Sequence, residues 1–119
     1  MKYMLLIYMA EDAMNEQERE QCYHDSAKLC RDLDTRGQFV SANPLQPITT
    51  ATSVRIREGK RLITDGPFAE TREHLGGYFL IDAQNLDDAI RVAAQIPGAK
   101  KGVVEIRPIV EISGLPSSG

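Results

Sequence analysis

The chain has 119 residues, of which 42% are hydrophobic and 26% charged, and its formal net charge is -3 at pH 7. This length suits one domain with one core, and the interleaved charges contain no basic block of the kind that indicates a nucleic-acid surface. No apolar run approaches the roughly 18 residues that cross a bilayer. The apolar segment 4–9 is followed by acidic residues and not by a signal-peptide cleavage site. We therefore expect a cytoplasmic protein without a nucleic-acid or membrane partner.

Residues 2–9 predict a strand that is covered on both faces, because both alternating sets of its side chains are largely apolar. Residues 15–36 predict a helix. Asn15 and Glu18 have the spacing of a capping box at its start, and Gly37 is a common type of residue just after a helix end.

One side of this helix carries a narrow stripe that we expect to be buried, and His24 lies on the opposite side. The stripe consists of Cys22, Ser26, Leu29, Cys30 and Leu33. The two cysteines would lie about 12 Å apart along the helix, which is too far for a disulfide, so we predict reduced thiols. With two histidines and no Cys-x-x-Cys motif, the sequence predicts neither a metal site nor a cofactor.

The middle of the chain predicts short strands. Residues 38–45 predict one strand, and residues 52–57 and 60–64 predict a hairpin with its turn at Glu58–Gly59. The hairpin delivers Asp65 to the end of a strand, where a rigid scaffold often presents functional groups.

The last third of the chain predicts a strand, a helix and a strand. Residues 76–82 form the first of these, and the Gly76–Gly77 pair indicates a bulge or a close approach of backbone or ligand. Residues 86–96 have helical periodicity. Residues 103–112 alternate as a strand, and Pro108 places this strand at a sheet edge or at a bulge.

This order of elements predicts an α+β, ferredoxin-like βαβ-βαβ fold with an inserted β-hairpin. Both helices would cover one face of an antiparallel sheet, so the other apolar face needs a second cover. A homodimer supplies that cover most simply. We expect one domain over residues 1–113 and a flexible tail over residues 114–119.

The segment 64–73 combines a rigid Asp-Gly-Pro turn with several charged side chains. Asp65 opens the turn, where it could either accept hydrogen bonds from the turn amides or take part in a site, and both alternatives stay open. Phe68 is expected to anchor the turn to the core. His74 follows the loop and is a weak candidate for an acid or base.

The run Asp65-Gly66-Pro67-Phe68-Ala69-Glu70-Thr71-Arg72-Glu73, followed by Gly76-Gly77-Tyr78, resembles the signature of the DGPF-domain branch of the YCII-related family. The family form usually has lysine at the position of Arg72. The resemblance implies a dimeric α/β barrel with a pocket near the Asp-Gly-Pro turn. It also implies a His–Asp pair in which Asp65 matches the aspartate, although no histidine of the first helix matches its partner. Proteins of the DGPF branch are often encoded beside extracytoplasmic-function sigma factors, so the resemblance also implies a regulatory connection.

Three functions follow from these observations. An acid–base enzyme for a small molecule would use Asp65, with His74 as a weaker candidate. Weak candidates for binding the substrate of such an enzyme are Glu70, Arg72, Glu73 and Arg107. A non-catalytic ligand-binding or regulatory module linked to a sigma factor would need the same pocket without catalytic geometry. The third alternative is purely structural: the Asp-Gly-Pro motif only shapes the turn and the dimer contact.

Overall fold

The structure of the chain is a computed structural model that describes residues 1–116. Its strands are β1 (Lys2–Met9), β2 (Phe39–Pro44), β3 (Thr52–Arg57), β4 (Lys60–Asp65), β5 (His74–Asp82) and β6 (Val103–Pro108). Its helices are α1 (Glu16–Thr35) and α2 (Leu86–Ala93), with short 3-10 turns η1 (Ile48–Thr50) and η2 (Pro97–Lys100). Neither α1 nor α2 is long and apolar enough to span a membrane.

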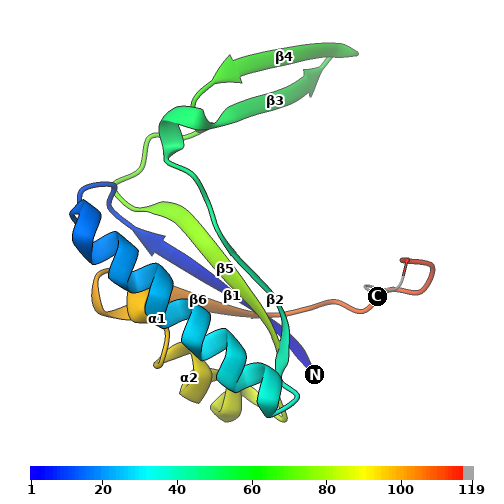
Figure 1. Cartoon of the computed structure of the whole chain (residues 1–119). Helices are drawn as coiled ribbons and strands as arrows, with labels where there is room; N and C mark the ends of the chain where they lie inside the picture. Colours follow the sequence, from blue (N-terminus) through cyan, green and yellow to red (C-terminus); the bar gives the residue numbers. More distant parts are fainter. Residues whose placement is uncertain (117–119) are drawn as a thin grey trace.

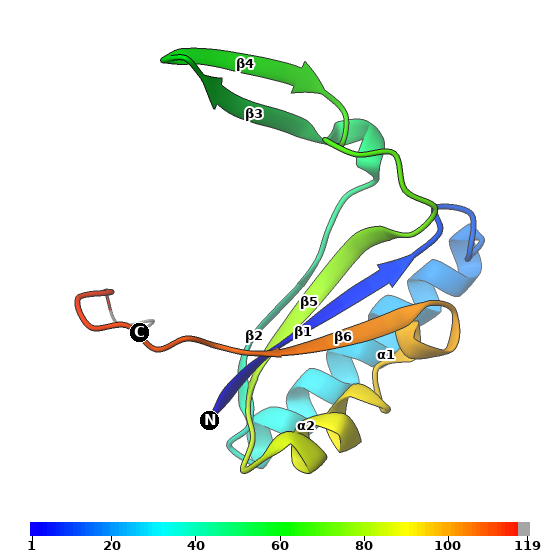
Figure 2. The ribbon, with the colours of Figure 1, turned by 180° about the vertical axis from the view of Figure 1, so that it is seen from behind.

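The main sheet is antiparallel and has the strand order β2-β5-β1-β6. Both helices cover the same face of this sheet (Figures 1 and 2). The hairpin β3–β4 is a separate two-stranded sheet between β2 and β5 in the chain, and it projects away from the rest of the molecule (Figure 1). The predicted α+β ferredoxin-like fold with an inserted hairpin is therefore confirmed.

The core lies between the sheet and the two helices. Tyr3 and Leu5 of β1 alternate toward the helices and are buried, as are Phe79 and Ile81 of the adjacent β5. The helices contribute Leu29, Leu33, Ala89, Val92 and Ala93. Burying one large apolar side chain stabilises a fold by about 1.5–3 kcal/mol, so this layer holds the strands and helices together.

The opposite face of the sheet is not covered by any helix of the described chain (Figure 2). Its apolar side chains come from the alternate positions of the two central strands. We call this surface the open face; it consists of Met4, Leu6, Tyr8 and Leu80. These side chains are half-buried, and the homodimer expected to cover them stays a prediction.

The first turn of α1 forms the predicted capping box. Asn15 Oδ1 accepts a hydrogen bond from the Glu18 amide at 2.8 Å, and Glu18 Oε1 accepts one from the Asn15 amide at 3.1 Å. Lys101 then forms an ion pair with the other carboxylate oxygen of Glu18 at 2.9 Å. The start of α1 is thereby attached to the turn before β6.

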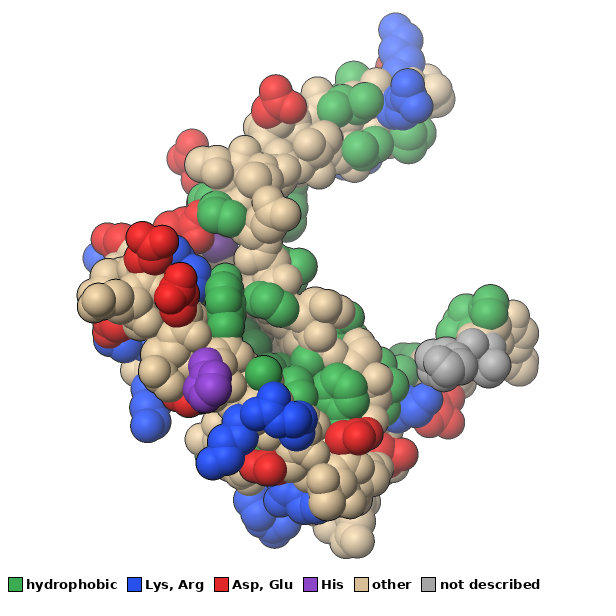
Figure 3. Space-filling model, in the orientation of Figure 1, with side chains coloured by type: hydrophobic (Ala, Val, Ile, Leu, Met, Phe, Trp, Pro, Cys, Tyr) green, Lys and Arg blue, Asp and Glu red, His purple; other side chains and the backbone are tan. Residues whose placement is uncertain are grey.

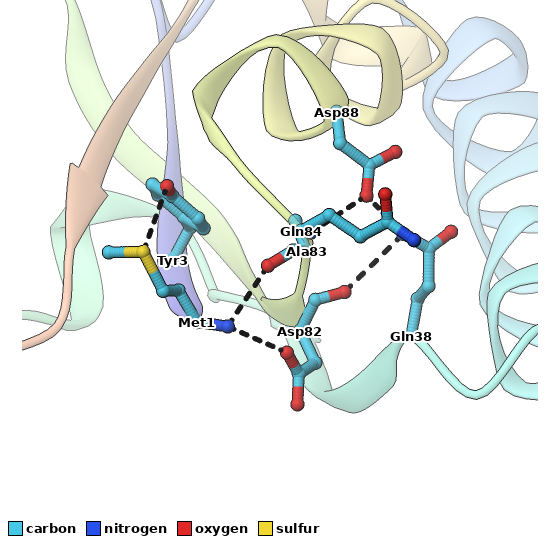
Figure 4. Close-up of polar contacts among 7 residues, drawn as sticks. All are labelled: Met1, Tyr3, Gln38, Asp82, Ala83, Gln84 and Asp88. Atoms are coloured by element: carbon cyan, nitrogen blue, oxygen red, sulfur yellow. Dashed lines mark hydrogen bonds and ion pairs between the residues drawn. The ribbon is translucent and has the colours of Figure 1, made fainter.

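Polar contacts connect the start of β1 with the end of β5 and the start of α2 (Figure 4). The Met1 amine donates to Asp82 Oδ1 at 3.1 Å and to the Ala83 carbonyl at 3.0 Å. Asp88 Oδ2 accepts from the Gln38 side chain at 3.0 Å and from the Gln84 amide at 3.1 Å. These bonds hold the end of the sheet that lies away from the hairpin.

The second helix is shorter than predicted, because α2 ends at Ala93 and not at Ile96. Pro97 opens η2 and holds the preceding Ile96 in an extended conformation with φ -69 and ψ 124, so the helix cannot continue through it. Of the apolar side chains of this segment, Leu86 and Ile90 are exposed, whereas Ala89, Val92 and Ala93 are buried.

The last strand is also shorter than predicted, because β6 ends at Pro108 and not at residue 112. Pro108 pairs with Tyr3, and the amide of Ile109 makes one further bond to the Lys2 carbonyl at 3.0 Å. Beyond this point the described part of β1 offers no further partner, and Val110 is 79% exposed. The edge position predicted from Pro108 is confirmed. Of the predicted tail, residues 117–119 lie outside the described chain.

Candidate functional site

A cavity of about 500 Å³ lies between α1, the end of β2 with the segment after it, and the start of β5. Figure 3 shows apolar side chains gathered in the hollow between the helix and the base of the hairpin. The apolar part of the lining includes Ile7, Met9, Met14, Ala42, Leu75 and Phe79. We call this space the α1–β2 cavity.

The side of α1 that faces the cavity carries Arg19, Cys22, Tyr23, Ser26 and Cys30. The stripe predicted on this helix therefore has two parts. Leu29 and Leu33 are buried in the core, whereas the smaller cysteine and serine side chains are half-buried along the cavity. Both thiols are free, and burial raises the pKa of Cys22 and of Cys30 above the usual value.

A bulge near the glycine pair brings His74 to the cavity. Ile7 pairs with Gly77, but Tyr8 pairs with Leu75, so the register of β1 and β5 shifts between them. The shift reverses the alternation of β5, and His74 lines the cavity together with its strand partner Met9. His74 Nδ1 lies 3.2 Å from the Thr71 hydroxyl, which orients the ring.

Packing also favours a glycine at Gly77, the second residue of the pair. A Cβ at Gly77 would lie 3.0 Å from the Asn43 carbonyl oxygen and 3.2 Å from the Pro44 Cα. The adjacent strand β2 therefore approaches β5 closely at the cavity wall. Both features that the glycine pair predicted, the bulge and the close approach, are confirmed.

The remaining predicted site residues do not line the cavity. Asp65 is exposed at the end of β4 and pairs through its backbone with Thr52. Glu70, Arg72 and Glu73 are exposed in the loop that follows. Arg107 is exposed on β6, at the opposite edge of the sheet from β2.

The Asp-Gly-Pro turn is held by residues outside the motif. The Gly66 amide donates to the Ala51 carbonyl at 2.7 Å, and the Ser53 hydroxyl donates to the Gly66 carbonyl at 2.9 Å. The prediction that Phe68 anchors this turn to the core is wrong, because Phe68 is 78% exposed. The turn follows β4 of the separate hairpin sheet, whereas the buried core residues of the described chain come from the main sheet, its two helices and adjoining turns.

A cluster of three polar side chains, Ser41, Asn43 and Tyr78, lies on β2 and β5 of the main sheet. The Tyr78 hydroxyl lies 3.0 Å from the Ser41 hydroxyl and accepts a hydrogen bond from the Asn43 side chain at 3.0 Å. These bonds, that from Ser41 first, lower the pKa of Tyr78 below its usual value. Within residues 1–116, no three His, Cys, Asp or Glu side chains lie close enough together to hold a metal ion.

Comparison with known proteins shows which family the chain belongs to. Residues 1–113 match the YCII-related domain. The chain belongs to the YCII-related family. It is also 34% identical to an uncharacterized protein of Rhizobium meliloti (strain 1021) over 114 residues, which cover 92% of each chain. Membership of the DGPF branch within the YCII-related family stays a prediction.

In this YCII-related protein, the described contacts do not join a histidine to Asp65. His74 contacts Thr71, and His24 is exposed on α1. The catalytic or turn-capping role of Asp65 therefore stays a prediction. Sequence reasoning identified His74 but missed Arg19 and Tyr23 as cavity residues. The available signal was the small and polar side chains in the α1 stripe, where a core-facing helix would usually have larger apolar residues.

Proposed function

We propose that this YCII-related protein binds a small, largely apolar molecule in the α1–β2 cavity. The observation that carries the proposal is the cavity itself, whose volume of about 500 Å³ is in the range of ligand pockets. Its lining is mainly apolar, with a small number of polar groups from α1 and β5. Such a lining favours burial of an apolar ligand and lets a few polar contacts select it.

We assign any proton transfer in this cavity to His74. Its imidazole lines the cavity, and the Thr71 hydroxyl at 3.2 Å restrains the ring. An imidazole can donate or accept a proton within hydrogen-bond reach of a bound molecule. Asp65, which does not line the cavity, acts in this proposal on the loop rather than on the ligand.

A thermal-shift screen against a metabolite library tests the binding proposal. A compound that binds the folded protein raises its melting temperature by mass action. We compare the wild type with Ser26→Leu, which fills the cavity from α1, and with Asp65→Asn, which leaves the cavity intact. A compound should stabilise the wild type and Asp65→Asn but not Ser26→Leu. Stabilisation that Asp65→Asn abolishes and Ser26→Leu keeps would move the site to the loop. No stabilising compound at all would contradict the proposal.

We also infer that the protein is a homodimer formed through the open face. Met4, Leu6, Tyr8 and Leu80 form an apolar surface that no helix of the described chain covers. Contiguous apolar surfaces of this kind usually bind a partner, and a two-fold axis lets one such surface cover another.

A regulatory function linked to an extracytoplasmic-function sigma factor is the alternative. The observation that favours a protein partner is the hairpin, whose Val54, Ile56 and Ile63 are 58%, 59% and 57% exposed. Stoichiometric capture of the purified sigma factor, without turnover of any metabolite, would support this alternative. Failure of the two purified proteins to associate would exclude it.

A further inference from the structure

Among the described residues, Arg19 is a cation at the α1–β2 cavity that forms no ion pair with a carboxylate. Its side chain is half-buried and lines the cavity. Within residues 1–116, the ion pairs of side-chain cations join Arg91 to Asp88 and Lys101 to Glu18, and none includes Arg19. A half-buried guanidinium loses part of its hydration, which an anion at the same place would offset.

The stability of α1 does not explain this arginine. Arg19 lies close to the N-terminus of the helix, where the helix dipole disfavours a positive charge. The nearby Glu18 is already bound to Asn15 and to Lys101. The charge of Arg19 therefore does not stabilise the N-terminus of α1, whereas it would stabilise a bound anion.

The other charged groups of the cavity are placed differently. Glu11 is exposed, and its Oε1 accepts a hydrogen bond from the Ile48 amide at 3.0 Å, so it holds the segment after β2. Arg31 is exposed and lies about 18 Å from Arg19 along the helix, at a rise of about 1.5 Å per residue. Of the two described arginines that line the cavity, Arg19 is thus the half-buried one.

We infer that the ligand of this cavity is an anionic amphiphile, a small carboxylic acid with an apolar body, and that Arg19 binds its carboxylate. The inference rests on the proposed function of the cavity. A guanidinium can donate two parallel hydrogen bonds to a carboxylate. The apolar body packs against Ile7, Met9 and Phe79, which line the same space.

Calorimetric titration with two matched pairs of probes tests the inference. The pairs are octanoate with octanamide and 2-naphthoate with 2-naphthamide, which keep each apolar body and remove the charge. The variants are Arg19→Gln and, as a control, Lys28→Gln. Lys28 is an exposed cation on the same helix that does not line the cavity, so both variants change the net charge equally.

We expect at least one acid to bind the wild type about tenfold or more tightly than its amide, as a charge-assisted hydrogen bond would give. Arg19→Gln should reduce the affinity for the acid to that for the amide, and Lys28→Gln should leave both affinities unchanged. Equal affinity for acid and amide, or an equal loss of both in Arg19→Gln, would overturn the inference and leave the proposed cavity function intact. No binding by either pair would overturn both.

Discussion

At the scale of single residues, Glu18 joins two parts of the structure through its two carboxylate oxygens. One oxygen completes the capping box with Asn15, and the other accepts a hydrogen bond from Lys101. These two bonds, that from Lys101 first, lower the pKa of Glu18 below its ordinary value of 4.5. The charged form is therefore the one that the fold stabilises.

This pKa shift predicts a pH-dependent effect of Glu18→Gln. Because the folded pKa is lowered, the stabilisation is fully present above pH 4.5 and is lost as the pH falls through the folded pKa. Urea unfolding should show the variant to be less stable than the wild type at neutral pH, with the difference disappearing in acid. Glu16→Gln, which removes a carboxylate from the same turn, should have a smaller effect. A difference that stays constant down to pH 3, a value roughly below most carboxyl pKa values, would contradict the assignment.

Single residues also show which parts of the site could be predicted. The spacing of Asn15 and Glu18 was sufficient to predict their bonds, because a capping box depends on adjacent residues of one helix turn. The position of His74 could not be predicted in the same way. It depends on the register of β5 against β1, and one bulge moves a side chain to the other face of the sheet.

At the scale of elements, the close approach of β2 and β5 predicts different effects for the two glycines. Gly77→Ala would place a Cβ 3.0 Å from the Asn43 carbonyl oxygen, whereas the nearest atom to a Cβ at Gly76 lies 3.8 Å away. We expect Gly77→Ala to lower the free energy of unfolding by about 1–3 kcal/mol, as overpacking does. Gly76→Ala should change it much less. Urea unfolding at a fixed protein concentration measures both, and equal losses in the two variants would count against this packing.

Strands β1 and β6 show why the ends of a strand are harder to predict than its presence. Apolar alternation in β1 correctly indicated a central strand, because both faces of a central strand contribute to its pattern. The apolar pattern of residues 109–112 continued that of β6, but pairing stopped where β1 begins. A strand ends where its partner ends, and the sequence of one strand does not contain that information.

At the scale of the whole molecule, the open face predicts a homodimer at micromolar concentration. Leu6 lies on β1, one of the two central strands of the sheet, and points to this face. Leu6→Lys should give a folded monomer, because the lysine faces solvent in one chain but would be buried in the dimer. Light scattering measures the mass, and circular dichroism checks the fold. Lys28→Gln, on the helix side, should stay dimeric. A monomeric wild type would contradict the dimer.

The cavity is also a property of the whole molecule, which is why its lining could not be predicted. It is formed by α1, the segment after β2 and the start of β5, which are far apart in the chain. The distinctive Asp-Gly-Pro motif indicated Asp65 as a site residue, but Asp65 ends β4 of the separate hairpin and does not line the cavity. Fold class follows from local patterns, whereas the shape of a cavity depends on how separate segments pack.

The most direct test of the central claim is a methyl NMR titration of the protein labelled at its four methionines. Met9 and Met14 line the α1–β2 cavity, Met4 lies on the open face, and Met1 directly precedes β1. A compound from the thermal-shift screen should shift the signals of Met9 and Met14 and leave those of Met1 and Met4 unchanged. Unchanged Met9 and Met14 signals, or a shift confined to Met4, would show that the compound binds elsewhere and would contradict the proposed site.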